Sequence, residues 1–471
     1  MTTSNDSAPV TPQVLASAPP LTFYGGLAGA LAPFACFLSG VAVLALSGAP
    51  DEKGFWPILL GALILGLLLA KDRERYSEAM LDGMSQRVVM IMLCAWFFAG
   101  VLGAVLSAGG LVSALATTAR SLHLTGGAYV GAAFLTAVLV STATGTSFGT
   151  ILLCGPILYP AGGGAGAAPA ALMGAILAGA TFGDSISPVS DTTIASSGTQ
   201  HVDIGGTVRS RLAYVIPAGL VALIASVLLG SGATSNSAAL PTATVHISAL
   251  TLLVAPTIVI AMLLAKRHLI ESLLMGISIA TVIALVLGLA RPYDLLHIAP
   301  GTFGATGIIV DGMQRAVGVS VFTLLLVALV GTLQATDALD RLVHFAQGRA
   351  SSARGAEIWI VSVVSGAVLL TTHSVVAMLA VGEFARQTGA RFGLSGYRRA
   401  NLLDMTVCTW PFLLPYFLPT ILTASASKSG DAFGMPVLSA GTVGLYNTYA
   451  WALVVTVLFA VLTGYGRVRD A

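Results

Sequence analysis

Ten apolar runs dominate the sequence, and most are long enough to form a helix that crosses a lipid bilayer. A helix needs about 20 apolar residues to span roughly 30 Å of hydrocarbon. The chain is 56% hydrophobic and only 9% charged. No run has the alternating pattern of a barrel strand, so helices are the expected spanning structure. The runs lie near 23–47, 54–70, 88–110, 169–196, 211–230, 248–265, 269–290, 316–335, 399–424 and 440–463.

Two further runs, 128–159 and 357–383, fit a single span poorly. The first has 32 residues, and a helix of that length would be about 48 Å long. Each run has a polar segment in its middle, "STATGTS" in the first and "TTHS" in the second. We therefore predict two re-entrant hairpins, each with two arms that meet at a polar tip. The alternative is a pair of kinked full spans.

The distribution of Lys and Arg favours the hairpins. Cytoplasmic loops of membrane proteins carry an excess of these residues. With twelve full spans the two sides carry 12 and 10 basic residues, whereas with ten spans and two hairpins they carry 17 and 5. The second arrangement predicts that both termini are cytoplasmic in a bacterial inner membrane. Residues 1–22 are rich in Ser, Thr, Pro and Ala and lack the pattern of a cleaved signal peptide, so we expect a disordered cytoplasmic tail.

The sequence also contains an internal repeat. The segment that starts at Asp82 matches the one that starts at Asp311 with one gap, after which Arg87 aligns with Arg315 at an offset of 228. The same offset places Thr144 on Thr372 and Thr146 on Ser374, so the two hairpin tips coincide. Each half, 23–230 and 248–465, holds five spans and one hairpin, so the halves are inserted in opposite orientations. The polar segment 231–247 is predicted to be an external linker between them.

Two of the predicted spans are interrupted by polar residues and prolines. The run 169–196 contains "GDSISP", from Gly183 to Pro188, and 399–424 contains Asp404 and several prolines. Proline frees backbone carbonyls in a helix, and irregular backbone within a membrane is tolerated only where it is buried in protein or lines a cavity. We therefore predict an all-α polytopic membrane protein with ten transmembrane helices and two re-entrant hairpins in inverted repeats, with broken helices at the midplane. Many secondary transporters have this architecture.

The polar groups at these breaks and tips suit a small dehydrated cation. Sodium prefers hard oxygen ligands such as carboxylates, carbonyls and hydroxyls. An ionised carboxylate within the membrane is costly, so Asp184 would hold either a proton or a cation. Asp184 and Thr146 are the predicted sodium ligands. The candidate binding residues are Asp184, Ser185, Ser187, Thr144, Gly145, Thr146, Ser147, Asp191, Thr192, Thr372, His373, Ser374, Asp404 and Thr406.

Some of these residues have a second interpretation. Asp191 and Thr192 could instead cap a helix or support the ligands. Asp404 could lie at a helix end, and His373 could be either a proton carrier or a packed histidine. Arg209 and Arg211 precede an apolar run, so we expect them to be anchors at the membrane surface.

The chain resembles the NhaC-type sodium/proton antiporter family in "TATGTSFGT" at 142–150 and "FGDSISPVSDTT" at 182–193. The resemblance places Thr144–Ser147, Gly183, Asp184, Ser187, Pro188, Asp191 and Thr192 on the family motifs. It implies secondary transport, an elevator-like movement of the hairpin-bearing part, and a homodimer. "TTHSVVAM" and "DMTVCTWP" in the second half match no family string.

Exchange of sodium for protons is the leading hypothesis. Transport of a small organic acid or amino acid coupled to a cation is the alternative, although neither polar segment contains an arginine to bind an anion. No nucleophile–base pair, phosphate-binding loop or dinucleotide fingerprint is present, so no enzyme activity and no cofactor are predicted. The net charge of +2 gives no indication of a nucleic-acid partner. The expected partners are the lipid bilayer, sodium and protons.

Overall fold

A computed structural model describes residues 20–46, 52–231, 247–265, 267–299 and 304–468. Most of the predicted tail 1–22 and of the linker 231–247 lies outside these residues. The helices of the first half, with one 3-10 helix labelled η, are α1 (Leu27–Leu46), η1 (Glu52–Gly54), α2 (Phe55–Leu69), α3 (Arg73–Met84), α4 (Arg87–Ala108), α5 (Leu111–Ser121), α6 (Gly127–Thr144), α7 (Ser147–Gly164), α8 (Pro169–Ile186), α9 (Asp191–Thr199) and α10 (Ile204–Gly230).

The second half has the same helical character and adds a short β-hairpin. Strands β1 (His297–Ala299) and β2 (Gly304–Thr306) pair in antiparallel orientation. The helices are η2 (Ile247–Leu253), α11 (Val254–Leu264), α12 (Leu269–Val286), α13 (Pro292–Leu295), α14 (Ile308–Gln334), α15 (Ala338–Ala346), α16 (Ala353–Thr371), α17 (Ser374–Arg391), α18 (Gly396–Val407), η3 (Trp410–Phe412), α19 (Leu418–Ala426), η4 (Ser427–Phe433), α20 (Ala440–Leu445) and α21 (Thr448–Thr463).

The predicted helical membrane fold is confirmed in its class. Among the described residues, eight helical segments are long and apolar enough to cross a membrane, and six of them coincide with predicted spans. The other two are α6 and α16, the first arms of the predicted hairpins. Three more predicted spans correspond to shorter apolar helices, and the run 399–424 is divided among α18, η3 and α19. The number of ten spans therefore stays a prediction.

The run predicted as the first hairpin forms two helices that fold back on each other. The N–H of Gly126, before α6, donates to the carbonyl of Ala165, after α7, at 2.9 Å. The Tyr129 hydroxyl donates to the carbonyl of Leu158 at 3.0 Å. The chain thus returns to the end from which it started. Each arm has 18 residues, or about 27 Å, so the hairpin is longer than the predicted range 128–159.

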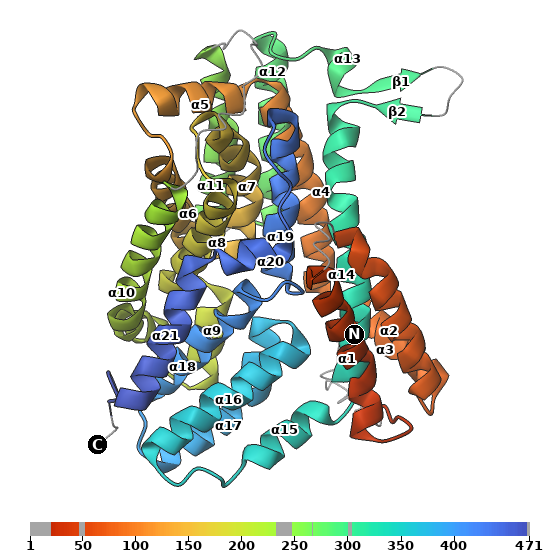
Figure 1. The fold of residues 1–471 in the computed structure, drawn as a ribbon, viewed down its shortest axis with the longest axis vertical. Coiled ribbons are helices and arrows are strands. Elements are labelled where there is room, and N and C mark those ends of the chain that lie inside the picture. Colours follow the sequence, from red (N-terminus) through yellow and green to blue (C-terminus); the bar gives the residue numbers. More distant parts are fainter. Residues whose placement is uncertain (1–19, 47–51, 232–246, 266, 300–303, 469–471) are drawn as a thin grey trace, which may run out of the picture.

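The run predicted as the second hairpin folds in the same way at the opposite end of the molecule. Helices α16 and α17 pack side by side (Figure 1). The short helix α15 precedes them, as α5 precedes α6 and α7. Figure 1 shows α5 at the top of the molecule and α15 at the bottom. The inverted orientation of the two halves stays a prediction.

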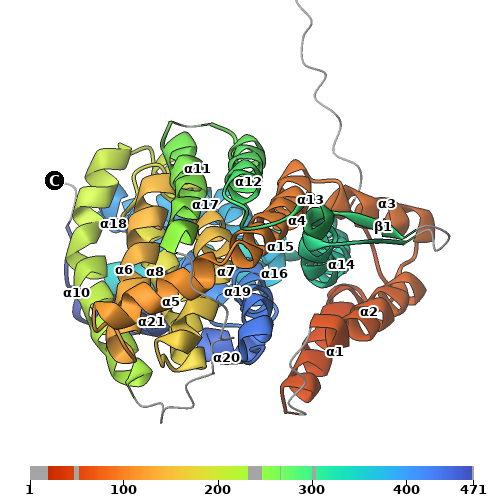
Figure 2. The ribbon, with the colours of Figure 1, turned by 90° about the horizontal axis from the view of Figure 1, so that it is seen from above.

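The two halves meet along α4 and α14, which lie between the hairpin-bearing helices and the α1–α2 pair (Figure 2). Glycines permit this close crossing. A Cβ atom on Gly100 of α4 would lie 2.3 Å from the carbonyl oxygen of Gly312 in α14, and one on Gly83 of the preceding helix α3 would lie 2.3 Å from that of Val327, also in α14. Any larger residue at either position would force the helices apart.

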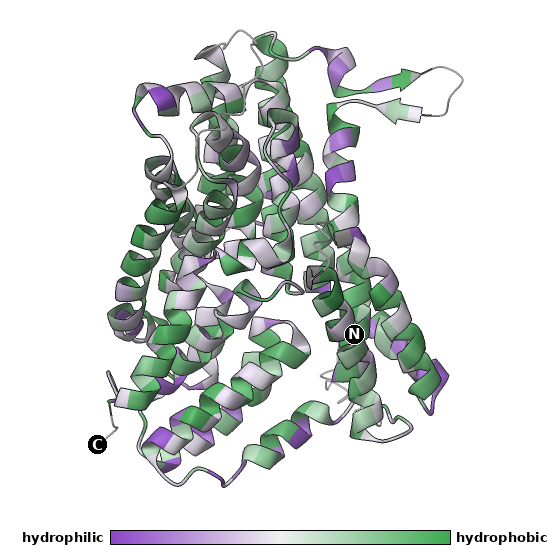
Figure 3. Ribbon diagram, in the orientation of Figure 1, coloured by the Kyte–Doolittle hydropathy of each residue, from purple (hydrophilic) through white to green (hydrophobic). Residues whose placement is uncertain are grey.

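The outer surface of the helical bundle is apolar, as a lipid-facing surface requires. Helix α10 shows this most clearly, with Leu220, Ile224 and Leu228 all more than half exposed. Figure 3 shows hydrophobic residues along most of the helices. Exposed apolar surface of this extent marks a membrane or protein contact, and together with the long apolar helices it indicates a multi-pass membrane protein.

Candidate functional site

A short irregular segment separates α8 from α9 at the "GDSISP" motif. Helix α8 ends at Ile186 and α9 begins at Asp191. The hydroxyl of Ser187, at the break, donates to the carbonyl of Thr142 in α6 at 2.8 Å. Gly183 allows α8 to approach the same arm, because a Cβ there would lie 2.5 Å from the carbonyl oxygen of Val138. The break is thereby attached to the first hairpin.

The tip of the first hairpin consists of Gly145 and Thr146. Gly145 ends α6 with a φ of +66°, and Thr146 caps α7 by accepting a hydrogen bond from the N–H of Gly149 at 3.3 Å. A Cβ on Gly145 would lie 2.7 Å from a side-chain carbon of Val189, which belongs to the break between α8 and α9. Conformation and contact both require glycine here.

The tip of the second hairpin repeats this geometry with different residues. Thr372 ends α16 with a φ of +53°, and His373 precedes α17 in an extended conformation like that of Thr146. The hydroxyl of Ser374 donates to the carbonyl of Val407 at 3.2 Å. In backbone geometry Thr372 therefore corresponds to Gly145. The expected pairing of Thr144 with Thr372 is wrong by one residue, because the offset at the tips is 227.

The two tips and the two interrupted helices line one cavity of about 50 Å³. The first tip contributes Thr146 and Ser147, and the second contributes Thr372, His373 and Ser374. The predicted residues that line this cavity are Thr146, Ser147, Asp184, Asp191, Thr192, Thr372, His373 and Ser374. The 3-10 helix η3 adds Pro411 and Phe412 to the lining, and the start of α19 adds Leu418 and Pro419.

Asp184 and Asp191 are the two carboxylates of the cavity. Asp184 is only 4% exposed, and among the described residues its Oδ1 atom has no hydrogen-bond partner. Asp191 is exposed, and its Oδ1 accepts the N–H of Thr192 at 2.8 Å. The Thr192 hydroxyl lies 3.0 Å from that of Ser190. Asp184 therefore retains free capacity for a proton or a cation, whereas one oxygen of Asp191 is already occupied by a backbone N–H in the first turn of α9.

His373 is the other titratable side chain of the cavity. Its Nδ1 atom is buried, and no hydrogen-bond partner for that atom lies within the described part of the chain. The ring lines the cavity together with Asp184. A buried ring nitrogen without a partner is free to bind a ligand or a proton.

Six predicted site residues do not line the cavity, although they lie close to it. The hydroxyls of Ser185, Thr144 and Thr406 donate to carbonyls within their own helices. Ser187 and Gly145 shape the break and the tip described above. Asp404 is fully buried in α18 and is occupied by an ion pair.

That ion pair joins Asp404 to Arg211. The Arg211 Nη2 atom lies 2.7 Å from Oδ2 of Asp404, and neither side chain is accessible. Arg211 also donates to the carbonyl of Ser185 at 3.0 Å and to the hydroxyl of Thr193 at 2.9 Å. The expectation that Arg211 anchors the membrane surface is therefore wrong. Its guanidinium instead holds the end of α8 and the start of α9 against α18.

The ion pair also changes the electrostatics expected from the sequence. Asp191 and Asp404 are close enough to Asp184 to interact with it electrostatically. Arg211 neutralises Asp404, so the excess negative charge lies at Asp184 and Asp191. An arginine does stand directly behind the break, contrary to the sequence-based argument against an anionic substrate, but a carboxylate already pairs with it.

The donor set at the cavity consists of carboxylates and hydroxyls. Among the described residues, no group of three or more His, Cys, Asp or Glu side chains could hold a metal ion. Asp184 with the hydroxyls of Thr146 and Ser147 resembles the oxygen environment that hard cations use. Transition metals, which favour imidazole and thiolate ligands, are poorly matched to this cavity.

A polytopic helical bundle with an internal polar cavity between two hairpin tips is a membrane transporter in its architecture. The Na+/H+ antiporter family matches residues 28–231. The Na(+)/H(+) antiporter NhaC of Alkalihalophilus pseudofirmus is 31% identical over 38% of this chain and 38% of its own. These matches confirm the resemblance to NhaC-type sodium/proton antiporters.

Two other relatives have names that refer to organic substrates. The arginine/ornithine antiporter ArcD of Halobacterium salinarum is 24% identical over 93% of this chain and 91% of its own. The malate-2H(+)/Na(+)-lactate antiporter of Bacillus subtilis is 31% identical over 36% of each chain. A solved structure, the Alcanivorax borkumensis YdaH transporter, covers 85% of this chain and 90% of its own at 15% identity, with a TM-score of 0.39.

Proposed function

We propose that this protein exchanges sodium for protons by alternating access, with both ions competing for Asp184. The observation that carries this proposal is the buried Asp184 carboxylate, which has an unpartnered oxygen in a cavity lined by hydroxyls from the first hairpin tip. A cation that enters this cavity can replace its water with the Asp184, Thr146 and Ser147 oxygens. A proton on Asp184 removes the charge that attracts the cation, so the two ions are exchanged rather than carried together.

The movement that we propose is an elevator-like displacement of the hairpin-bearing helices against α1, α2, α4, α11, α12 and α14. The close glycine contacts between α4 and α14 support a rigid scaffold at that seam. We also propose a homodimer in the bacterial inner membrane with both termini cytoplasmic. The distribution of basic residues supports this orientation.

Cation-coupled transport of a small organic acid or amino acid is the second candidate. One observation from the comparisons favours it: a relative that aligns over 93% of this chain has the name of an amino-acid antiporter. The unpartnered ring nitrogen of His373 adds a group that could bind a substrate.

One experiment separates the two candidates. Purified protein in acid-loaded liposomes is exposed to sodium, lithium or potassium, and separately to malate, lactate, arginine or ornithine, while a dye reports internal pH. We expect sodium alone to dissipate the proton gradient. A response that requires one of the organic compounds would replace sodium/proton exchange with the second candidate.

A further inference from the structure

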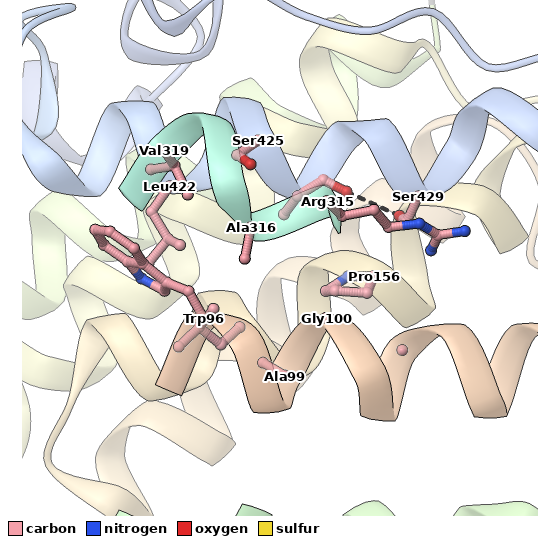
Figure 4. Close-up of a pocket in the computed structure, with 13 residues that line it drawn as sticks. Trp96, Ala99, Gly100, Pro156, Arg315, Ala316, Val319, Leu422, Ser425 and Ser429 are labelled. Carbon is pink, nitrogen blue, oxygen red and sulfur yellow. Dashed lines mark hydrogen bonds between the residues drawn. The ribbon is translucent and has the colours of Figure 1, made fainter. Parts of the chain in front are cut away.

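A second cavity, of about 50 Å³, lies apart from the site described above (Figure 4). Helices α4, α7, α14 and α19 and the start of η4 line it. Most lining side chains are apolar or small, and they include Trp96, Leu152, Val319 and Leu422. The cavity is partly open, so a molecule from outside could enter it. Because its walls are membrane helices, the molecules most available to it are lipids.

Arg315 is the charged residue of this cavity among the described residues that line it. Figure 4 shows its guanidinium and the Trp96 ring at opposite ends. Arg315 forms no ion pair with a described residue, but Asp311, one turn earlier on α14, is near enough to interact with it electrostatically, and the Arg315 side chain is partly buried. A guanidinium at this place can bind a phosphate through two N–H donors.

The position of Arg315 along α14 fits the headgroup of a lipid. Arg315 is seven residues from the start of the helix at Ile308, or about 10 Å along its axis. The apolar lining extends deeper, from Ala316 to Val319 on α14 and down α4 to Trp96. The positively charged Arg315 side chain thus lies near a helix end, and the apolar surface lies farther inside the membrane. The phosphate and the acyl chain of a phospholipid follow each other in the same order.

The cavity also lies on the seam between two groups of helices. Helices α4 and α14 form one wall, and α7 and α19, which reach the transport cavity with Ser147 and Leu418, form the other. We propose that this cavity is a binding site for one anionic phospholipid, with the phosphate on Arg315 and an acyl chain against Trp96 and Leu422. The bound lipid joins the two walls and stabilises the arrangement seen here. The binding claim does not depend on which ion is transported.

Binding can be measured on the purified full-length protein by native mass spectrometry and thermal unfolding, with phosphatidylglycerol as the added lipid. The wild type should retain one molecule. Arg315→Gln should weaken its binding roughly tenfold, because a charge-assisted contact is lost, and Arg315→Lys should restore only part of it, because lysine keeps the charge but not the two paired donors. Ala316→Leu should also weaken binding, because the larger side chain fills the cavity. If Ala316→Leu does not fold, Ser425→Leu tests the same effect from the opposite wall.

The internal repeat supplies a matched control. Arg87 aligns with Arg315 but is exposed and lies outside the cavity, so Arg87→Gln should leave lipid binding unchanged. Equal retention of phosphatidylglycerol by the wild type and Arg315→Gln would overturn the proposal. Equal stabilisation by phosphatidylcholine or by inorganic phosphate would also overturn it, since neither combines a net negative headgroup with an acyl chain.

Discussion

At the scale of single residues, Arg211 and Asp404 support the cavity between the two hairpin tips. Both side chains are inaccessible and lie 2.7 Å apart. Replacing one partner leaves an uncompensated buried charge, which costs about 3–5 kcal/mol, whereas replacing both by apolar residues is often nearly neutral. We expect Arg211→Met to lower the melting temperature strongly.

The double variant Arg211→Met with Asp404→Leu tests the reason for that loss. It should recover most of the lost melting temperature, because no charge is left unpaired. Circular dichroism in detergent measures both variants. If the double variant is as unstable as Arg211→Met, the ion pair is not the source of the effect.

Asp184 and Asp191 could be predicted from the sequence, but the role of Arg211 could not. A carboxylate inside an apolar run is a conspicuous local signal. An arginine at the start of such a run is typical of a surface anchor, and Asp404 lies 193 residues away. Asp404 could have indicated the ion pair, because a carboxylate within the membrane requires a positively charged partner.

At the scale of secondary-structure elements, the two hairpin tips shape the cavity. Each hairpin turns through one residue in the left-handed conformation, which is Gly145 in the first tip and Thr372 in the second. A non-glycine residue in this conformation costs roughly 1–2 kcal/mol. Gly145→Ala should therefore destabilise the protein, and its Cβ would also meet Val189. Thr372→Gly should be neutral or slightly stabilising, because the strain is relieved.

Thermal unfolding of the two variants measures this contrast, with Gly166→Ala as the control. Gly166 also has a positive φ, +67°, but a Cβ there meets nothing within 4 Å. Gly145→Ala should lose more stability than the control. An equal loss would show that the contact with Val189 has no energetic effect.

The elements of the site were predicted better than their register. Polar residues in the middle of long apolar runs located both tips. The one-residue shift between the repeats was invisible, because Thr372 occupies the left-handed position that glycine occupies in the first tip. The cavity at Arg315 requires four helices that are distant in sequence, so no local pattern predicts it.

The opposed orientation of the hairpins defines the whole molecule. Thr125 lies before the first hairpin and Ser351 before the second, and both are exposed. With Cys36, Cys94, Cys154 and Cys408 replaced, a cysteine at Thr125 should react with an impermeant maleimide from outside the cell. A cysteine at Ser351 should react only after the membrane is opened. Reaction of both from the same side would contradict the inverted repeat.

Competition between sodium and a proton at Asp184 is the central claim, and calorimetry on the purified protein tests it most directly. Sodium that displaces one proton should bind up to about tenfold more weakly for each unit of decrease in pH, and its binding should release a proton to the buffer. Asp184→Asn should abolish both the binding heat and the proton release, while Asp404→Asn with Arg211→Met retains them. Sodium binding that is independent of pH, or that persists in Asp184→Asn, would contradict the account.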